Sequence, residues 1–156
     1  MRRKDRQITD TAAISHVIDS CDVCRIAISD GEIPYIVPMN FGYTFEEGVL
    51  TLYLHGASEG RKIDLIRAAG GWAAFEMDTD HDLVSGEVAC DYSFRYHSVI
   101  GGGVITFAAT SEEKEAGLRQ ILRHYGGSDD LPMQKAFLAQ TCVMKMTVTE
   151  YSCKGH

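Results

Sequence analysis

The spacing of apolar residues along the chain predicts four helices joined to a set of strands. In the first helix, the apolar positions 13, 14, 17 and 18 form one stripe, and Thr9 or Asp10 can cap its start. Thr110 can cap a later helix, with Glu113 reaching back in a capping box. The predicted helices cover residues 10–20, 61–69, 110–125 and 131–140.

Apolar runs between these helices predict strands that are joined mainly by tight turns. Asp30-Gly31 and Glu47-Gly48 are typical turn pairs, and the glycines at 101–103 are expected to mark a bulge. Pro34 and Pro38 lack the N–H that a sheet needs, so their strand is expected at an edge or bulged. The predicted strands cover residues 24–29, 33–41, 49–55, 72–77, 93–109 and 142–152. Five or six strands with few helices indicate a mainly β, antiparallel barrel with helical appendages.

Composition narrows the class of protein further. The 156 residues are 45% hydrophobic and 24% charged, which is typical of one globular domain, here residues 1–156. The net charge of −7 argues against nucleic-acid binding, because the basic run at residues 1–6 is short and terminal. No apolar stretch approaches the ~20 residues that span a bilayer, and the start lacks the apolar core of a signal peptide. Five cysteines, an odd number, are expected to be reduced thiols of a cytoplasmic protein.

The segment 55–62, between a strand and a helix, carries the most informative chemistry. Gly56-Ala57-Ser58-Glu59-Gly60 fits the nucleophile elbow G-x-S-x-G of a hydrolase. Asp78 or Asp80, followed by His97 or His124, would complete a triad in the order serine, acid, histidine. An elbow needs a parallel sheet, however, and the preceding residues are typical of antiparallel hairpins.

The same segment has two other interpretations. Arg61 and Lys62 occupy the first helical turn, where the helix dipole disfavours positive charge by roughly 0.3–1 kcal/mol each. This placement is explained if a phosphate binds there, held by backbone N–H groups, the Ser58 hydroxyl and both cations. The alternative is that both side chains are simply solvated, and the spacing alone leaves these two interpretations open.

Four segments, in their order and spacing, resemble a known superfamily. They are Val37-Pro38-Met39-Asn40-Phe41, Leu54-His55-Gly56-Ala57, Gly60-Arg61-Lys62-Ile63 and Tyr96-His97-Ser98-Val99-Ile100-Gly101. Together they resemble the FMN-binding split-barrel superfamily, and within it the Nim-type 5-nitroimidazole-resistance proteins, relatives of pyridoxamine 5′-phosphate oxidase. The resemblance covers about residues 8–155. It implies a six-stranded antiparallel split β-barrel (α+β) with peripheral helices, and a homodimer with two FMN sites at its interface.

The resemblance also implies which residues bind FMN. The phosphate cradle falls on Ser58, Arg61 and Lys62. His55 lies near the flavin ring and the ribityl chain, either as a catalytic proton donor or only as a cofactor contact. The partner subunit's contribution falls on Ser98, with His97 as a second candidate. The strand beside the isoalloxazine ring falls on Val37, Pro38, Met39 and Asn40.

The end of the chain departs from the pyridoxamine 5′-phosphate oxidases. Those enzymes carry a C-terminal Trp and an Arg/His set, whereas this chain ends in Tyr151-Ser152-Cys153-Lys154-Gly155-His156 and has only Trp72. We therefore expect flavin-dependent reduction of a small electrophile such as a 5-nitroimidazole, and not pyridoxamine 5′-phosphate oxidation. The alternatives are a flavin-binding protein without enzymatic activity and a haem-binding split barrel.

Two further motifs resemble metal sites only in part. Cys21-Asp22-Val23-Cys24 fits C-x-x-C, but no second pair follows at zinc-finger spacing. Asp78-Thr79-Asp80-His81-Asp82 begins like a calcium loop, but Leu83 and Ala89 stand where glycine and glutamate are needed. We expect no metal site, and we expect residues 78–82 to form an exposed acidic loop.

Overall fold

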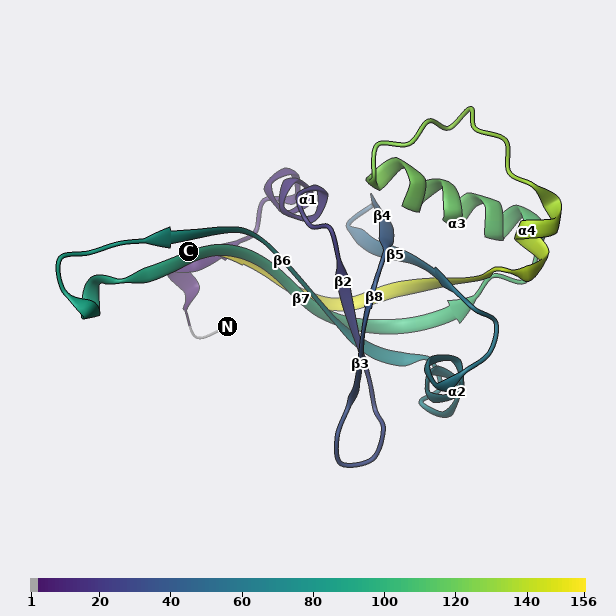
Figure 1. Ribbon diagram of the computed structural model, residues 1–156, viewed down its shortest axis with the longest axis horizontal. Helices are drawn as coiled ribbons and strands as arrows, with labels where there is room; N and C mark the ends of the chain where they lie inside the picture. The colour runs from purple at the N-terminus through teal and green to yellow at the C-terminus, as the bar shows by residue number, and fades with distance from the viewer. Residues whose placement is uncertain (1–2) are drawn as a thin grey trace.

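One antiparallel sheet forms the body of the protein, with helices along its flanks (Figure 1). The computed structural model describes residues 3–156, so that Met1 and Arg2 of the basic run lie outside the described residues. The short elements are η1 (Lys4–Arg6), β1 (Gln7–Ile8) and η2 (Ala89–Asp91). The helices are α1 (Thr11–Asp19), α2 (Arg61–Ala68), α3 (Ser111–His124) and α4 (Lys135–Gln140). The other strands are β2 (Cys24–Ile28), β3 (Tyr35–Met39), β4 (Phe41–Glu46), β5 (Val49–Gly56), β6 (Trp72–Val84), β7 (Ser93–Phe107) and β8 (Cys142–Gly155).

The hydrogen-bonded sheet is open, and the chain itself connects its two edges. The strand order is β3-β2-β6-β7-β8-β5-β4, with β1 paired to β8. The edge strands β3 and β4 follow one another directly, separated only by Asn40. If they count as one strand and the two-residue β1 is set aside, six strands remain. The predicted mainly β, antiparallel split barrel with peripheral helices is therefore confirmed.

Local capping and turn chemistry explain why the helices and hairpins form where they do. The Asp10 carboxylate accepts a hydrogen bond from the Ala13 N–H at the start of α1, and Thr110 and Glu113 form the predicted capping box of α3. The predicted turn at 47–48 is confirmed, with both Glu47 and Gly48 at positive φ. Among residues 3–156, no helix is long and apolar enough to cross a membrane.

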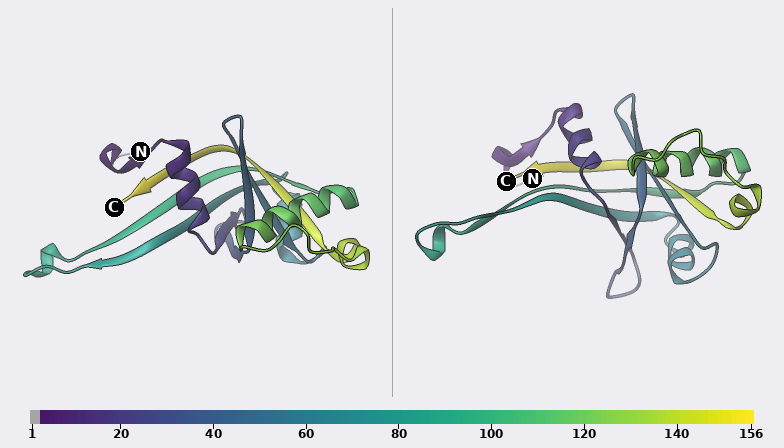
Figure 2. Two further views of the ribbon diagram at one scale, coloured as in Figure 1. Left: turned by 90° about the horizontal axis from the view of Figure 1, so that it is seen from above. Right: turned by 45° about the horizontal axis from the view of Figure 1, so that its top comes forward.

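The hairpin of β6 and β7 extends well beyond the rest of the sheet, and it corrects one expectation. Residues 78–82 were expected to form an exposed acidic loop, but they belong to β6, with a register shift between Thr79 and Asp82. Arginines and histidines on the same hairpin and on β2 pair with these carboxylates, which makes an acidic strand tolerable. The pairs are Arg25 with Glu76 and Asp78, His81 with Asp78, His97 with Asp80, and Arg95 with Asp82. Figure 2 shows this hairpin pointing away from α3 and α4.

β7 is one continuous strand, and the expected bulge lies within it. The register with β8 shifts between Gly102 and Gly103, as the glycine run predicted. The predicted helix at 131–140 is shorter in the structure, because α4 begins only at Lys135.

Helix α3 packs directly on the outer face of the barrel because two glycines allow it. A Cβ on Gly42 of β4 would lie 2.2 Å from the Gln120 carbonyl carbon of α3. A Cβ on Gly117 of α3 would lie 2.7 Å from a Val143 methyl group of β8 and 3.2 Å from the Tyr53 ring. The backbone of β4 at Gly42 therefore touches the backbone of α3, while Gly117 of α3 packs on the side chains of Val143 and Tyr53, and these contacts hold α3 beside β4 and β5.

Candidate functional site

The connection between β5 and α2 places a lysine ammonium over the end of a strand. β5 ends at Gly56, residues 57–60 are exposed, and α2 begins at Arg61 after Gly60, whose φ is 111°. The Lys62 side chain turns back, so that a Cβ on Gly56 would lie 2.7 Å from its Nζ. Burial lowers the pKa of Lys62, and the opposing influence of the Cys142 thiol is smaller. Within residues 3–156, no carboxylate forms an ion pair with this ammonium.

The other two residues of the predicted phosphate cradle lie differently. The Arg61 guanidinium is bound to the Asp30 carboxylate at the β2–β3 turn and lies over the Tyr35 ring, 5.1 Å from its centroid. Ser58 is exposed in the β5–α2 connection. The structure therefore brings Lys62 and Ser58 to one connection, while Arg61 points toward the neighbouring hairpin.

His55 lies immediately before this connection and is partly buried. Its Nδ1 is buried and has no hydrogen-bond partner among the described residues. Burial lowers the pKa of His55, and the positive charge of Lys62 lowers it further. The imidazole is therefore neutral at neutral pH, and one of its nitrogens can accept a hydrogen bond.

A pocket of about 620 Å³ opens beside His55. Asn40, at the split between β3 and β4, lines it together with His55. The remaining wall is mainly apolar and comes from α3, α4 and the segment between them: Leu118, Ile121, Leu122, Tyr125, Pro132, Met133, Gln134, Phe137 and Leu138. Pockets of this size and character bind small organic molecules.

The strand predicted to lie beside the flavin ring runs along the barrel edge. Met39 is buried in the core and Val37 packs against it. Pro38 and Asn40 are exposed on the other side. Pro38 and Asn40 are therefore the most accessible members of the predicted set.

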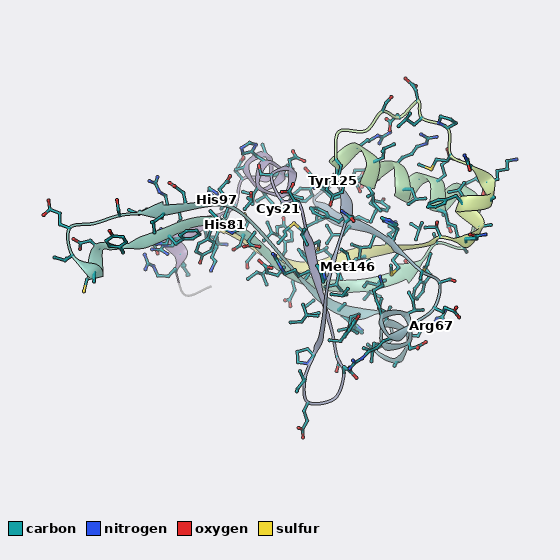
Figure 3. All side chains as sticks on the ribbon, in the orientation of Figure 1. Cys21, Arg67, His81, His97, Tyr125 and Met146 are labelled. Carbon is teal, nitrogen blue, oxygen red and sulfur yellow. The ribbon has the colours of Figure 1, made fainter. Side chains whose placement is uncertain are left out.

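His97 and Ser98 lie far from Lys62 within one chain. Both belong to the β6–β7 hairpin, and Figure 3 shows His97 on this hairpin and Arg67 of α2 at the opposite side of the molecule. His97 Nδ1 lies 2.8 Å from a carboxylate oxygen of Asp80. The Ser98 hydroxyl is buried and lacks a hydrogen-bond partner among the described residues. A single chain therefore does not unite all predicted FMN contacts.

The sequence did not single out the pocket wall. Leu118, Leu122 and Tyr125 lie on the predicted helix 110–125 and face the pocket. Phe137 is a further wall residue, and it is 64% exposed.

The structure argues against the hydrolase hypothesis. All strand pairs among residues 3–156 are antiparallel, so the parallel sheet that a nucleophile elbow requires is missing from this part of the chain. His97 is bound to Asp80, and His124 Nε2 lies 2.8 Å from the Cys21 carbonyl oxygen. Neither histidine lies at the β5–α2 connection with Ser58.

The cysteine pair has the environment of structural thiols. Cys21 and Cys24 are both buried, and burial raises the pKa of Cys21 to about 12. Among residues 3–156, no cluster of three or more His, Cys, Asp or Glu side chains could hold a metal ion.

Comparisons with known proteins agree with the fold. The pyridoxamine 5′-phosphate oxidase family profile matches residues 10–155. A candidate 5-nitroimidazole antibiotic resistance protein from Bacteroides thetaiotaomicron shares 33% identity over 96% of this chain and 86% of its own, with a TM-score of 0.81.

Two more distant structures share the fold. The flavocytochrome Anf3 from Azotobacter vinelandii is 20% identical over 100% of this chain and 72% of its own, with a TM-score of 0.80. An FAD- and haem-binding protein from Mycobacterium smegmatis is 22% identical over 96% of this chain and 72% of its own, also with a TM-score of 0.80. A comparison with curated proteins finds no match. The profile match over nearly the whole chain, together with the 33% identical structure, shows that this chain belongs to the pyridoxamine 5′-phosphate oxidase-like family.

Proposed function

We propose that this protein binds FMN and, with it, reduces small electrophiles of the 5-nitroimidazole type. The observation that carries the proposal is the partly buried Lys62 ammonium, which lies over Gly56 without an ion-pair partner among the described residues. A buried charge without a partner is costly, and a phosphate would remove that cost. The 33% identical relative, a candidate 5-nitroimidazole resistance protein, supports the substrate class.

Lys62 and Ser58 would hold the phosphate, together with the backbone N–H groups at the start of α2. Gly60 provides no side-chain cap, and its carbonyl oxygen accepts from the N–H groups of Ile63 and Asp64. The N–H groups of the first turn before them are available to an anion. Arg61 would add its charge from the β2–β3 side, where Asp30 now holds it.

The flavin ring would lie along Pro38 and Asn40, with His55 beside it. A neutral His55 can hydrogen-bond the ring or the substrate without adding a second positive charge next to Lys62. When bound, the flavin would supply the redox chemistry: with two electrons from an external donor and two protons, a nitro group would be reduced to a nitroso group and water. The protein's own contribution is binding, orientation and the exclusion of water by the apolar pocket wall.

A second copy of the chain would complete the site. Ser98 follows His97 on the β6–β7 hairpin, and Figure 3 shows His97 at the opposite side of the molecule from Arg67 of α2, so Ser98 cannot serve the β5–α2 connection of its own chain. A closed two-fold dimer would bring each Ser98 to the other subunit's flavin. This arrangement follows the homodimer that the sequence resemblance implied.

The test uses protein reconstituted with FMN. The bound flavin is reduced with dithionite without oxygen, and a 5-nitroimidazole is then added. We expect reoxidation faster than that of free FMN at the same concentration. Equal rates would show a flavin-binding protein without reductase activity, and protein that takes up no FMN would contradict the proposal entirely.

Haem is the second candidate ligand. A neutral imidazole next to an apolar pocket of about 620 Å³ is a suitable haem-iron ligand, and His55 provides one. One structure with the same fold is described as an FAD- and haem-binding protein, and another as a flavocytochrome. An absorption spectrum of the purified protein separates the two cofactors, because flavin bands and a haem Soret band are distinct.

A further inference from the structure

The pocket beside His55 differs in chemistry from the β5–α2 connection where Lys62 lies. Apolar side chains of α3 and of residues 132–138 form most of its wall. Its polar groups are few: Asn40, His55, Gln134 and the Tyr125 hydroxyl. Such a lining is suited to a flat apolar molecule, which the few polar groups can orient by hydrogen bonding.

None of the residues that line this pocket carries a charge at neutral pH. His55 is neutral because burial and then Lys62 lower its pKa. The Tyr125 hydroxyl is already engaged: it accepts from the Phe41 N–H at 3.2 Å and donates to the Asp22 carbonyl oxygen at 2.8 Å. An anionic group that entered the pocket would therefore lose water without gaining a cation, whereas an uncharged ring would lose little.

We propose that this pocket is the substrate compartment of the flavin site, and that it selects uncharged planar aromatic molecules over anionic ones of similar size. The inference rests on the proposed function, since the bound molecule is a substrate only if the flavin site exists. The pocket adjoins that site because His55 and Asn40 border both the pocket and the predicted path of the flavin ring. The volume of about 620 Å³ accommodates a substituted aromatic ring.

Phe137 offers a way to change this selectivity without disturbing the core. Its side chain lines the pocket although the residue is 64% exposed, so a polar replacement costs little stability. Leu131 is a matched control: it lies six residues earlier, is 52% exposed and does not line the pocket. Phe137→Lys adds a cation at the pocket, and Leu131→Lys adds the same cation outside it.

The experiment titrates 4-nitrobenzyl alcohol and 4-nitrobenzoate into FMN-reconstituted protein by calorimetry. We expect the uncharged alcohol to bind at least about tenfold more tightly than the carboxylate. Phe137→Lys should narrow or reverse this preference, and Leu131→Lys should leave it unchanged. A separate FMN titration of each variant should give the native affinity, because neither residue lies at the β5–α2 connection.

Several outcomes would overturn the inference. They are equal binding of both probes to the native protein, no binding of either probe, and an equal effect of the two lysine variants. A haem that displaces the alcohol, with a Soret band that His55→Ala removes, would also overturn it. If FMN fails to bind but the unreconstituted protein still prefers the alcohol, and Phe137→Lys still changes this preference, then the proposed flavin function fails while the selective pocket stands.

Discussion

The ammonium of Lys62 lies against the backbone of Gly56, in the space that a side chain at position 56 would fill. A Cβ there would meet Nζ at 2.7 Å and Cε at 3.5 Å. The glycine therefore lets a residue from the first turn of α2 return to the last residue of β5. This contact brings the lysine charge next to His55, and our account of phosphate binding depends on it.

Gly56→Ala should weaken FMN binding while the protein remains folded. The added methyl group would meet only the far end of a flexible lysine, which can move away at low cost. Moving the ammonium removes or lengthens a charge-assisted hydrogen bond, so we expect a loss of FMN affinity of about tenfold. Flavin fluorescence titration measures the affinity, and thermal unfolding of the apoprotein should be nearly unchanged. Native FMN affinity in this variant would show that the contact has no role in binding.

Gly42→Ala, in contrast to Gly56→Ala, should strongly lower the stability of the fold. A Cβ at position 42 would lie 2.2 Å from the backbone of Gln120, so α3 would have to move off β4. We expect a loss of about 1–3 kcal/mol or more in unfolding free energy, measured by urea denaturation. The control is Gly102→Ala, where the nearest atom, the Ala73 carbonyl oxygen, is 3.5 Å from the added Cβ. Equal stability of the two variants would contradict the direct packing of α3 on the strand.

FMN affinity should also depend on pH in a way that riboflavin affinity does not. Lys62 binds a phosphate only as an ammonium, and burial lowers its pKa below the ordinary 10.5. The charge is present below this lowered pKa and is lost as the pH rises through it. We expect the FMN-to-riboflavin affinity ratio to fall as the pH rises through this pKa, measured by parallel titrations. A constant ratio would show that no titrating cation contacts the phosphate.

Dimerisation is a separate expectation of the account. If Ser98 of one subunit completes the flavin site of the other, FMN-loaded protein should sediment as a dimer. Each chain has a mass of 17.2 kDa. A stable monomer that retains one FMN per chain would contradict the shared site.

The sequence predicted the elements that depend on local chemistry. The caps at Asp10 and Thr110 and the turn at Gly48 are formed by neighbouring residues, so short motifs reveal them. The acidic strand at 78–82 could not be predicted, because its partners Arg25 and His97 come from other strands. Long-range pairing there outweighed a composition that is typical of a loop.

The candidate site also has a part that local sequence predicts and a part that depends on long-range contacts. Lys62 and His55 belong to one short motif, and the structure places them side by side. The salt bridge of Arg61 to Asp30 links a helix to a distant turn, and spacing along the chain gives no sign of it. The contribution of Phe137 to the pocket wall also depends on tertiary packing, because α4 must fold back toward the barrel for Phe137 to reach the pocket.

The most direct test of the account compares FMN with riboflavin on Lys62→Ala, because riboflavin lacks the phosphate. A charge-assisted hydrogen bond contributes roughly 1.5–3 kcal/mol, so this variant should bind FMN about ten- to a hundredfold more weakly, with riboflavin affinity unchanged. Arg61→Ala, whose guanidinium is already paired with Asp30, should lower FMN affinity less. Unchanged FMN affinity in Lys62→Ala, or an equal fall for both flavins, would contradict the placement of the phosphate at Lys62.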